Sequence, residues 1–219
     1  MSAHGEETDS ERSLAPTAPA PRKVLVIACG ALAREIVALS AATGRAFDVT
    51  CLPAKLHNRP EKIPEAVRAK IRAGRERYDD ILCLYGDCGT GGLLDAVLAE
   101  EGVERIAGAH CYAFYAGEPD FDAMMEDEPG SFFLTDFLAR HFERLIIEGL
   151  GLDRFPQLRD DYFHAYVRLV YLAQTDDAQL DAKAEAGARR LGLAYERRRT
   201  GYGGLGDFLN NAAERAWRA

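Results

Sequence analysis

The sequence predicts an α/β fold, with a mostly parallel sheet covered by helices on both faces in a Rossmann-like arrangement. Short apolar runs, such as KVLVIACG at 23–30 and DDILCLYG at 79–86, are typical of buried parallel strands. Segments with apolar residues at helical spacing separate these runs, and such alternation indicates βαβ units. We expect a single α/β domain over residues 23–219, preceded by a disordered, Pro/Ala-rich leader at 1–22.

The predicted strands and helices follow one another in a regular order. Each strand is a short run rich in Val, Ile, Leu or Tyr, whereas each helix has apolar residues at helical spacing. We expect strands at 23–30, 47–54, 79–89, 103–114, 167–174 and 193–204. We expect helices at 31–44, 59–78, 92–102 and 177–192, and a last helix at 205–217.

The segment at 119–165 departs from this alternation and is predicted to be a helical insertion. Its core is SFFLTDFLARHFERLIIEGLGL at 131–152. Ser131 or Thr135 is the candidate N-cap of this helix, because a hydroxyl oxygen accepts a backbone N–H of the first turn.

The composition argues against several classes of protein. The chain of 219 residues has 27 Lys and Arg against 35 Asp and Glu, a formal net charge of −8. Because phosphate contacts need a basic surface, we expect no nucleic-acid partner. The apolar runs are far shorter than the roughly 20 residues of a membrane helix, and the N-terminus lacks a signal-peptide pattern. We therefore expect a cytoplasmic protein without a membrane partner.

Thiol, imidazole and polar side chains gather at the predicted strand ends. Ligands of open parallel sheets bind outside the carboxyl ends of the strands, so we expect these side chains to share one crevice. The six ends carry Cys29, the run His57 to Arg59, Asp87 with Cys88, His110 with Cys111, Gln174 with Thr175, and the run Thr200 to Tyr202.

The cysteines suggest a metal site. Their odd number, five, does not indicate a disulfide framework. Cys29, Cys88 and Cys111 stand at strand ends, with His110 as an alternate ligand and His57 nearby. Thiolates and imidazoles suit zinc, and thiolates also suit an iron–sulfur cluster. The other interpretation is that these thiols are buried and bind nothing. The remaining cysteines are expected to be packing residues inside apolar strands: Cys51 and Cys83.

The glycine-rich turn at 87–92 precedes a predicted helix. Backbone N–H groups at a helix N-terminus bind phosphate or carboxylate groups, so Gly89, Thr90 and Gly91 are candidates for holding a small anion. Their spacing matches neither the Walker loop nor the dinucleotide fingerprint, and we expect no nucleotide cofactor.

Eight motifs occur in a fixed order between Lys23 and about Phe208: IACGALAREI, LPAKLHNRPEKI, YGDCGTGGLLDAVL, RIAGAHCYAFYAG, EPGSFFLTDFLARHF, GLGLDRFPQLRDDYF, RLVYLAQT and TGYGGL. Together they resemble a bacterial and archaeal family classified as a domain of unknown function. Members of that family are often encoded beside corrinoid-dependent methyltransferases and corrinoid proteins. The resemblance implies that the family pattern includes Cys29, His57, Asn58, Arg59, Asp87, Cys88, His110, Cys111, Gln174, Thr175, Gly201 and Tyr202.

With the strand-end residues, the resemblance favours a metal-dependent enzyme of one-carbon or methyl-group metabolism, a methyltransferase or related transferase acting on a small molecule. The candidate catalytic residues are Asp87, Glu118 and His57, which would accept protons or orient ligands. The candidate substrate-binding residues are Asn58, Arg59, Gly89, Thr90, Gly91, Gln174, Thr175 and Tyr202. Two alternatives stay open: a non-catalytic accessory protein that binds a corrinoid protein, its cofactor or a methyltransferase, and a small-molecule sensor.

Overall fold

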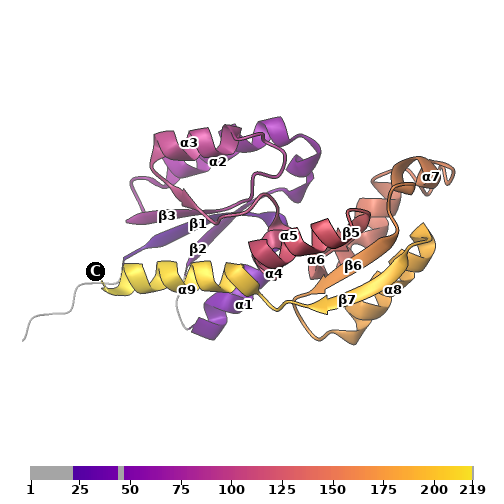
Figure 1. Ribbon diagram of the computed structural model, residues 1–219. Helices are drawn as coiled ribbons and strands as arrows, with labels where there is room; N and C mark the ends of the chain where they lie inside the picture. The colour runs from indigo at the N-terminus through magenta and orange to yellow at the C-terminus, as the bar shows by residue number, and fades with distance from the viewer. Residues whose placement is uncertain (1–21, 44–46, 219) are drawn as a thin grey trace, which may run out of the picture.

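The chain folds into two parallel β-sheets with helices packed around them, as Figure 1 shows for the computed structural model. The structure describes residues 22–43 and 47–218, so the predicted leader at 1–22 lies outside the described residues except for Arg22. The prediction of an α/β, Rossmann-like fold with parallel strands is confirmed. The strands are divided between two sheets, whereas the sequence pattern alone indicates one.

The first sheet has the strand order β2-β1-β3-β4, and its strand β1 is buried along its whole length. All its pairs are parallel, which agrees with the unbroken apolar run VLVIAC of β1. Its strands are β1 (Val24–Cys29), β2 (Asp48–Leu52), β3 (Asp80–Leu84) and β4 (Glu104–Arg105). Its connecting helices are η1 (Gly30–Leu32), α1 (Ala33–Thr43), η2 (Ala54–Asn58), η3 (Pro60–Lys62), α2 (Ile63–Gly74) and α3 (Leu93–Glu101).

The second sheet has the strand order β5-β6-β7, and again every pair is parallel. Its central strand β6 is buried after its first residue. Its strands are β5 (Ser131–Leu134), β6 (Arg168–Ala173) and β7 (Ala194–Arg199). Its helices are α6 (Asp136–Arg140), the π-helix η4 (Glu143–Glu148), α7 (Leu158–Phe163) and α8 (Ala178–Leu191).

The chain passes between the two sheets twice. Helices α4 (Cys111–Ala116) and α5 (Glu118–Asp127) lead from the first sheet to the second. Helix α9 (Gly203–Arg218) then returns to the first sheet, where it lies beside α1 in Figure 1 and contacts both α1 and α4. Because Leu205 and Leu209 of α9 belong to the apolar core of the first sheet, the return stabilises that sheet.

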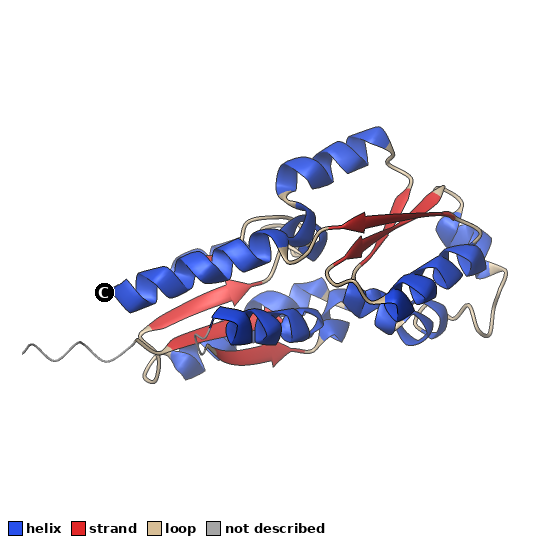
Figure 2. Ribbon diagram, turned by 90° about the horizontal axis from the view of Figure 1, so that it is seen from below, coloured by secondary structure: helices blue, strands red, loops and turns tan. Residues whose placement is uncertain are grey.

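The strands of both sheets point toward the junction between the sheets, as the arrows in Figure 2 show. Side chains from both carboxyl edges influence one another there. Burial raises the pKa of Glu35, in the first turn of α1, and the charge of Asp136, at the start of α6, raises it further. Polar groups from the ends of both sheets therefore meet in one region, which is where ligands of parallel sheets bind.

Two expected elements differ in the structure. Residues 131–134 form β5 rather than the start of a helix, and the helix begins after Thr135, whose hydroxyl accepts the N–H of Leu138 at 3.4 Å. The predicted strand at 103–114 is reduced to β4, since Cys111 already opens α4. Phe133 packs against Phe121 of α5, a contact between segments that periodicity cannot anticipate.

The two cysteines expected inside apolar strands have different environments. Cys83 in β3 is completely buried, as predicted, and burial raises the pKa of its thiol to about 12. Cys51 in β2 is exposed, so the prediction that it is a packing residue is wrong. Strand β2 is the edge strand of its sheet, and Leu52 is the only residue of this strand that is buried. None of the helices that the structure describes between residues 22 and 218 has the length and apolar character of a membrane span.

Candidate functional site

A small cavity lies at the carboxyl edge of the first sheet. Its volume of about 10 Å³ is close to the space that a single water molecule needs. Cys29, Cys88 and Cys111 all line it together with His57, so the structure brings together four of the residues that strand placement selects. The rest of its lining is Ala31, Leu32, Leu84, Tyr85, Gly86 and Phe114.

Each cysteine reaches the cavity from a different element. Cys29 ends β1 and caps η1, since its Sγ accepts the N–H of Ala31 at 3.4 Å. Cys88 lies in the loop after β3 in a left-handed conformation with φ of 50°. Cys111 is the first residue of α4. The three sulfurs thus come from segments far apart in the sequence, and only the fold places them together.

The loop of Cys88 and the loop before α4 are held in direct contact. The N–H of Cys88 donates to the Ala109 carbonyl at 2.9 Å. Gly86 makes a close approach possible, because a Cβ atom at this position would lie only 2.9 Å from the same Ala109 oxygen. This pairing of loops is what brings Cys88 to the same cavity as Cys111.

His57 stands at the edge of the cavity in η2, with an exposed side chain. Its Nδ1 lies 2.8 Å from the Ala54 carbonyl oxygen and 3.9 Å from Cys29 Sγ. A carbonyl only accepts hydrogen bonds, so Nδ1 carries the proton in the neutral ring and Nε2 is the nitrogen left to accept one. A hydrogen bond with Cys88 raises the pKa of His57. His57 is therefore a basic group beside the thiols.

The interior of the cavity disfavours charge. Burial raises the pKa values of Cys29 and Cys111, which keeps both thiols protonated at neutral pH. The Tyr85 side chain is 1% exposed, and its hydroxyl has no hydrogen-bond partner among the described residues. An unpaired buried hydroxyl costs free energy, so a bound water or ligand in this cavity would stabilise the structure.

Asp87 is occupied by its own loop. Its carboxylate accepts hydrogen bonds from the Thr90 hydroxyl and from the N–H groups of Gly91 at 3.1 Å and Gly92 at 2.9 Å. These hydrogen bonds lower the pKa of Asp87, and the one from Thr90 has the largest effect. Asp87 thereby fills the anion position at the N-terminus of α3 that the sequence assigns to a small ligand.

Several other predicted site residues lie outside the cavity lining. Asn58, the last residue of η2, and Arg59, between η2 and η3, are exposed, and Gly89 is exposed beside Pro60 of η3. His110, the predicted alternate metal ligand, is exposed ahead of α4, and Glu118 is exposed in the first turn of α5. None of these residues is part of the lining of the thiol cavity.

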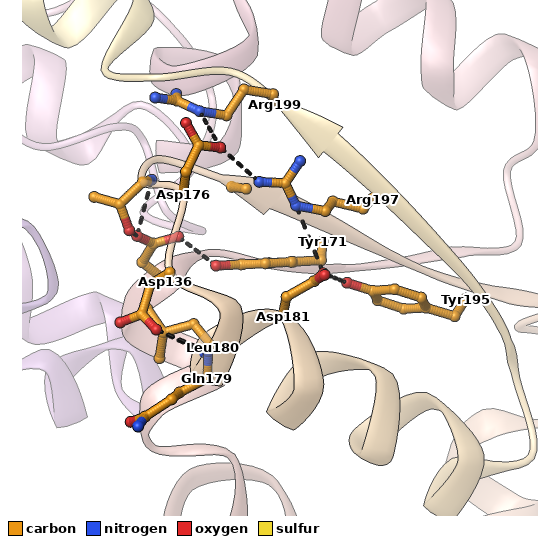
Figure 3. A network of polar contacts seen from close by, with 12 residues as sticks. Asp136, Tyr171, Asp176, Gln179, Leu180, Asp181, Tyr195, Arg197 and Arg199 are labelled. Atoms are coloured by element: carbon orange, nitrogen blue, oxygen red, sulfur yellow. Dashed lines mark hydrogen bonds and ion pairs between the residues drawn. The ribbon is translucent and has the colours of Figure 1, made fainter.

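Gln174 and Thr175 contribute to a polar network at the carboxyl end of β6. The Asp136 carboxylate accepts hydrogen bonds from the Tyr171 hydroxyl at 2.7 Å and from the N–H groups of Gln174 at 3.0 Å and Thr175 at 3.1 Å. Figure 3 shows Tyr171 pointing at Asp136, with Asp176 held between two arginines of β7. The two predicted substrate contacts thus tie β6 to α6.

Tyr202, just before α9, is half-buried on the side of the junction that faces Asp136 and Glu35. Burial raises the pKa of its hydroxyl, and the two carboxylates raise it further. Glu35 itself is 5% exposed, and its Oε2 has no hydrogen-bond partner among the described residues. Tyr202 and Glu35 therefore belong to the junction of the two sheets rather than to the thiol cavity.

Sequence patterns point to some of these residues only weakly. Glu35 is a single acid within the apolar helix ALAREIVALS, and Asp136 follows an apolar run that reads as helix. Tyr85 follows the apolar residues of a strand, where a tyrosine is common, so the sequence does not mark it as a site residue. The signal that could have found Glu35 is its helical spacing from Leu32 and Leu39, which both pack in the core of the first sheet.

No group of three or more His, Cys, Asp or Glu side chains in the described part of the chain has the arrangement of a formed metal site. The three thiols and His57 line one cavity, but they do not surround a common point as ligands do. Binding an ion there requires the side chains to turn inward.

Comparison with known proteins identifies the chain at the level of family. Residues 51–209 match the family described as "Protein of unknown function (DUF1638)". No curated protein and no solved structure matches the chain. The matched span includes His57, Cys88 and Cys111, whereas Cys29 precedes it. Since the match covers well over half of the sequence, the chain belongs to the DUF1638 family.

Proposed function

We propose that the protein is a metal-dependent transferase of one-carbon metabolism whose metal is held by Cys29, Cys88 and Cys111. The observation that carries this proposal is the meeting of three thiols and one imidazole at a single small cavity. Sulfur and nitrogen donors suit zinc, and three protein ligands leave the fourth position for a substrate. The cavity volume of about 10 Å³ favours a single ion over an iron–sulfur cluster.

The donor set fits such an ion even though the thiols are not yet arranged around it. Burial keeps Cys29 and Cys111 protonated, and a divalent cation would reverse this by stabilising the thiolates. Once bound, zinc would supply Lewis acidity that holds a thiol substrate as its nucleophilic thiolate. Because Nδ1 holds the proton of the neutral ring, Nε2 of His57 is the candidate acceptor of the substrate's proton.

The roles proposed for the remaining site residues follow from where each side chain lies. Asp87 is fully engaged by its loop, which favours a structural role, and the catalytic role passes to His57. Asn58 and Arg59 are exposed next to His57, where they would contact an acidic group of the substrate. The link to corrinoid-dependent methyl transfer rests on the family resemblance, and it makes a methyl group the proposed cargo.

Elemental analysis of protein purified without chelators tests the metal. We expect about one zinc ion per chain in the wild type and none in Cys88→Ser. Cys51→Ser is the matched control, because Cys51 is an exposed thiol outside the cavity, and this variant should keep its metal. Metal-free wild-type protein, or equal metal content in the two variants, would contradict the proposal.

Methyl transfer from methylcobalamin to a small thiol tests the reaction, followed by the absorbance of the corrinoid. We expect His57→Gln to transfer about a hundredfold more slowly than wild type, since a general base contributes about that factor. If neither the wild type nor the variant transfers the methyl group, but the wild-type chain forms a stable complex with a corrinoid protein, the accessory role replaces the enzymatic one.

A further inference from the structure

A second, chemically different pocket lies on the other sheet. Its volume is about 480 Å³, within the range of small-molecule sites. It is formed by the end of α6, the π-helix η4 and the outer face of α8. We call it the basic pocket, because its lining includes Arg140, His141, Arg144, Lys183 and Arg190 and only one acid, Glu143.

The charges of the basic pocket are largely uncompensated. Glu143 pairs with Arg190 at 2.5 Å. Arg144 and Lys183 are exposed and have no carboxylate partner among the described residues. Arg140 donates a 3.5 Å hydrogen bond to the Asp136 carbonyl and acts electrostatically on the Glu35 carboxylate. This local excess of positive charge contrasts with the chain as a whole, which has a net charge of −8.

The cations of the basic pocket act together on His141, which lies among them. Burial lowers the pKa of His141, and the charges of Arg144, Arg140, Arg34 and Lys183 lower it further. Arg34 belongs to α1 of the first sheet, so cations from both halves of the molecule act on one point. Gathering like charges costs free energy in the absence of an anion, and a bound anion removes that cost.

The local backbone supports a built pocket rather than a loose surface cluster. η4 is a π-helix, a form that is rare and frequently found at functional sites. Phe142, just before η4, packs tightly on α8, because a Cβ atom at Gly187 would lie 2.9 Å from its ring. This contact holds the η4 and α8 walls at a fixed separation, and Phe142 and Gly187 form part of the lining.

We propose that the basic pocket binds a phosphate-bearing small molecule. Arginine guanidinium groups make paired hydrogen bonds to phosphate oxygens, and a lysine adds a compact positive charge. Arg140, Arg144 and Lys183 offer this combination around a space large enough for a phosphate ester. The site is separate from the thiol cavity, and its ligand does not depend on whether a metal is bound there.

Calorimetric titration with inorganic pyrophosphate tests the pocket. The double variant Arg144→Gln/Lys183→Gln removes two exposed cations without disturbing the core, and we expect it to bind at least tenfold more weakly than wild type. Lys70→Gln, an exposed lysine on α2, is the matched control and should bind as the wild type does. Wild-type affinity should also fall as salt is raised.

Three outcomes would overturn the proposal. The first is that the wild type does not bind pyrophosphate. The second is that the double variant binds pyrophosphate as tightly as Lys70→Gln does. The third is that the pocket binds an acidic protein but not pyrophosphate. Thermal unfolding of each variant verifies that the chain is folded, so weaker binding is attributable to the lost charges.

Discussion

At the scale of single residues, burial rather than sequence position decides which groups are chemically unusual. Glu35 and the hydroxyl of Tyr85 are both buried polar groups without a full set of hydrogen bonds among the described residues. The thiols of Cys29 and Cys111 are shifted toward their neutral form by the same desolvation. Asp87 shows the opposite case, since three hydrogen bonds stabilise its charge.

Replacing Glu35 with glutamine should change how stability depends on pH. The pKa of Glu35 is raised in the folded protein, so its stabilising effect is complete below the unfolded pKa and is lost as pH rises through the folded pKa. Glu35→Gln should therefore be more stable than wild type at pH 8 and should lose that advantage near pH 4. Urea unfolding at both pH values measures this.

The control is Glu76→Gln, an exposed acid after α2, which should follow the wild-type pH profile. A Glu35→Gln variant that is less stable than wild type at pH 8 would mean that the carboxylate has a charged partner in solution.

Zinc affinity should rise with pH. Ligand thiols must lose protons before they bind a metal, and the pKa values of Cys29 and Cys111 are raised by burial. We expect affinity to increase about tenfold or more per pH unit between pH 6.5 and 8, measured by competition with a chromophoric chelator. An affinity that does not change over this range would argue against thiolate ligands.

At the scale of elements, the sequence predicts where the strands lie better than it predicts which strands pair in one sheet. The apolar runs of β1, β3 and β6 are unbroken, which is why they can be located without a structure. β5 is misread because SFFL is followed directly by helix-forming residues, and four apolar residues fit either structure. The proximity of Cys29, at the end of β1, and Cys88, in the loop after β3, was predictable, because parallel strands end at one edge of a sheet.

The loop between β3 and α3 should be sensitive to a single methyl group. Gly86→Ala places a Cβ atom against the Ala109 carbonyl, a backbone group that cannot rotate away. We expect a loss of about 1–3 kcal/mol of unfolding free energy and weaker zinc binding, because Cys88 is displaced from Cys111.

The matched control for this loop is Gly206→Ala in α9, where the nearest atom to a new Cβ would be 3.6 Å away. Alanine in a helix interior should leave the stability unchanged or raise it by up to about 1 kcal/mol. Equal effects of the two alanines in denaturant unfolding would show that Gly86 has no special steric role.

At the scale of the whole molecule, the two sheets are joined by more than a linker. The βαβ pattern is the same whether strands share a sheet or not, so sequence alone does not reveal the division. The sequence did not reveal the basic pocket either, since α6, η4 and α8 supply its charges from separate parts of the chain. Helix α9 is the element that makes the two halves interdependent.

Trimming one leucine in α9 should weaken the first sheet selectively. Leu209 is 1% exposed in the core of the first sheet, and Leu209→Ala should cost about 2–5 kcal/mol. Hydrogen exchange should then accelerate mainly in β1 and α1. Leu191→Ala, in the core of the second sheet, should accelerate exchange mainly in β6 and α8. The same pattern in both variants would show that the cores are not separate.

The return of α9 also bears on how the protein is made. During synthesis the strands of the first sheet emerge early, yet Leu205 and Leu209, which complete their core, emerge only after the whole second sheet. The half of the molecule that carries the thiol cavity therefore waits for the last described helix before its apolar surface is covered. A nascent chain halted between β7 and α9 would display that surface to the cell's folding machinery, with its cysteines still open to oxidation.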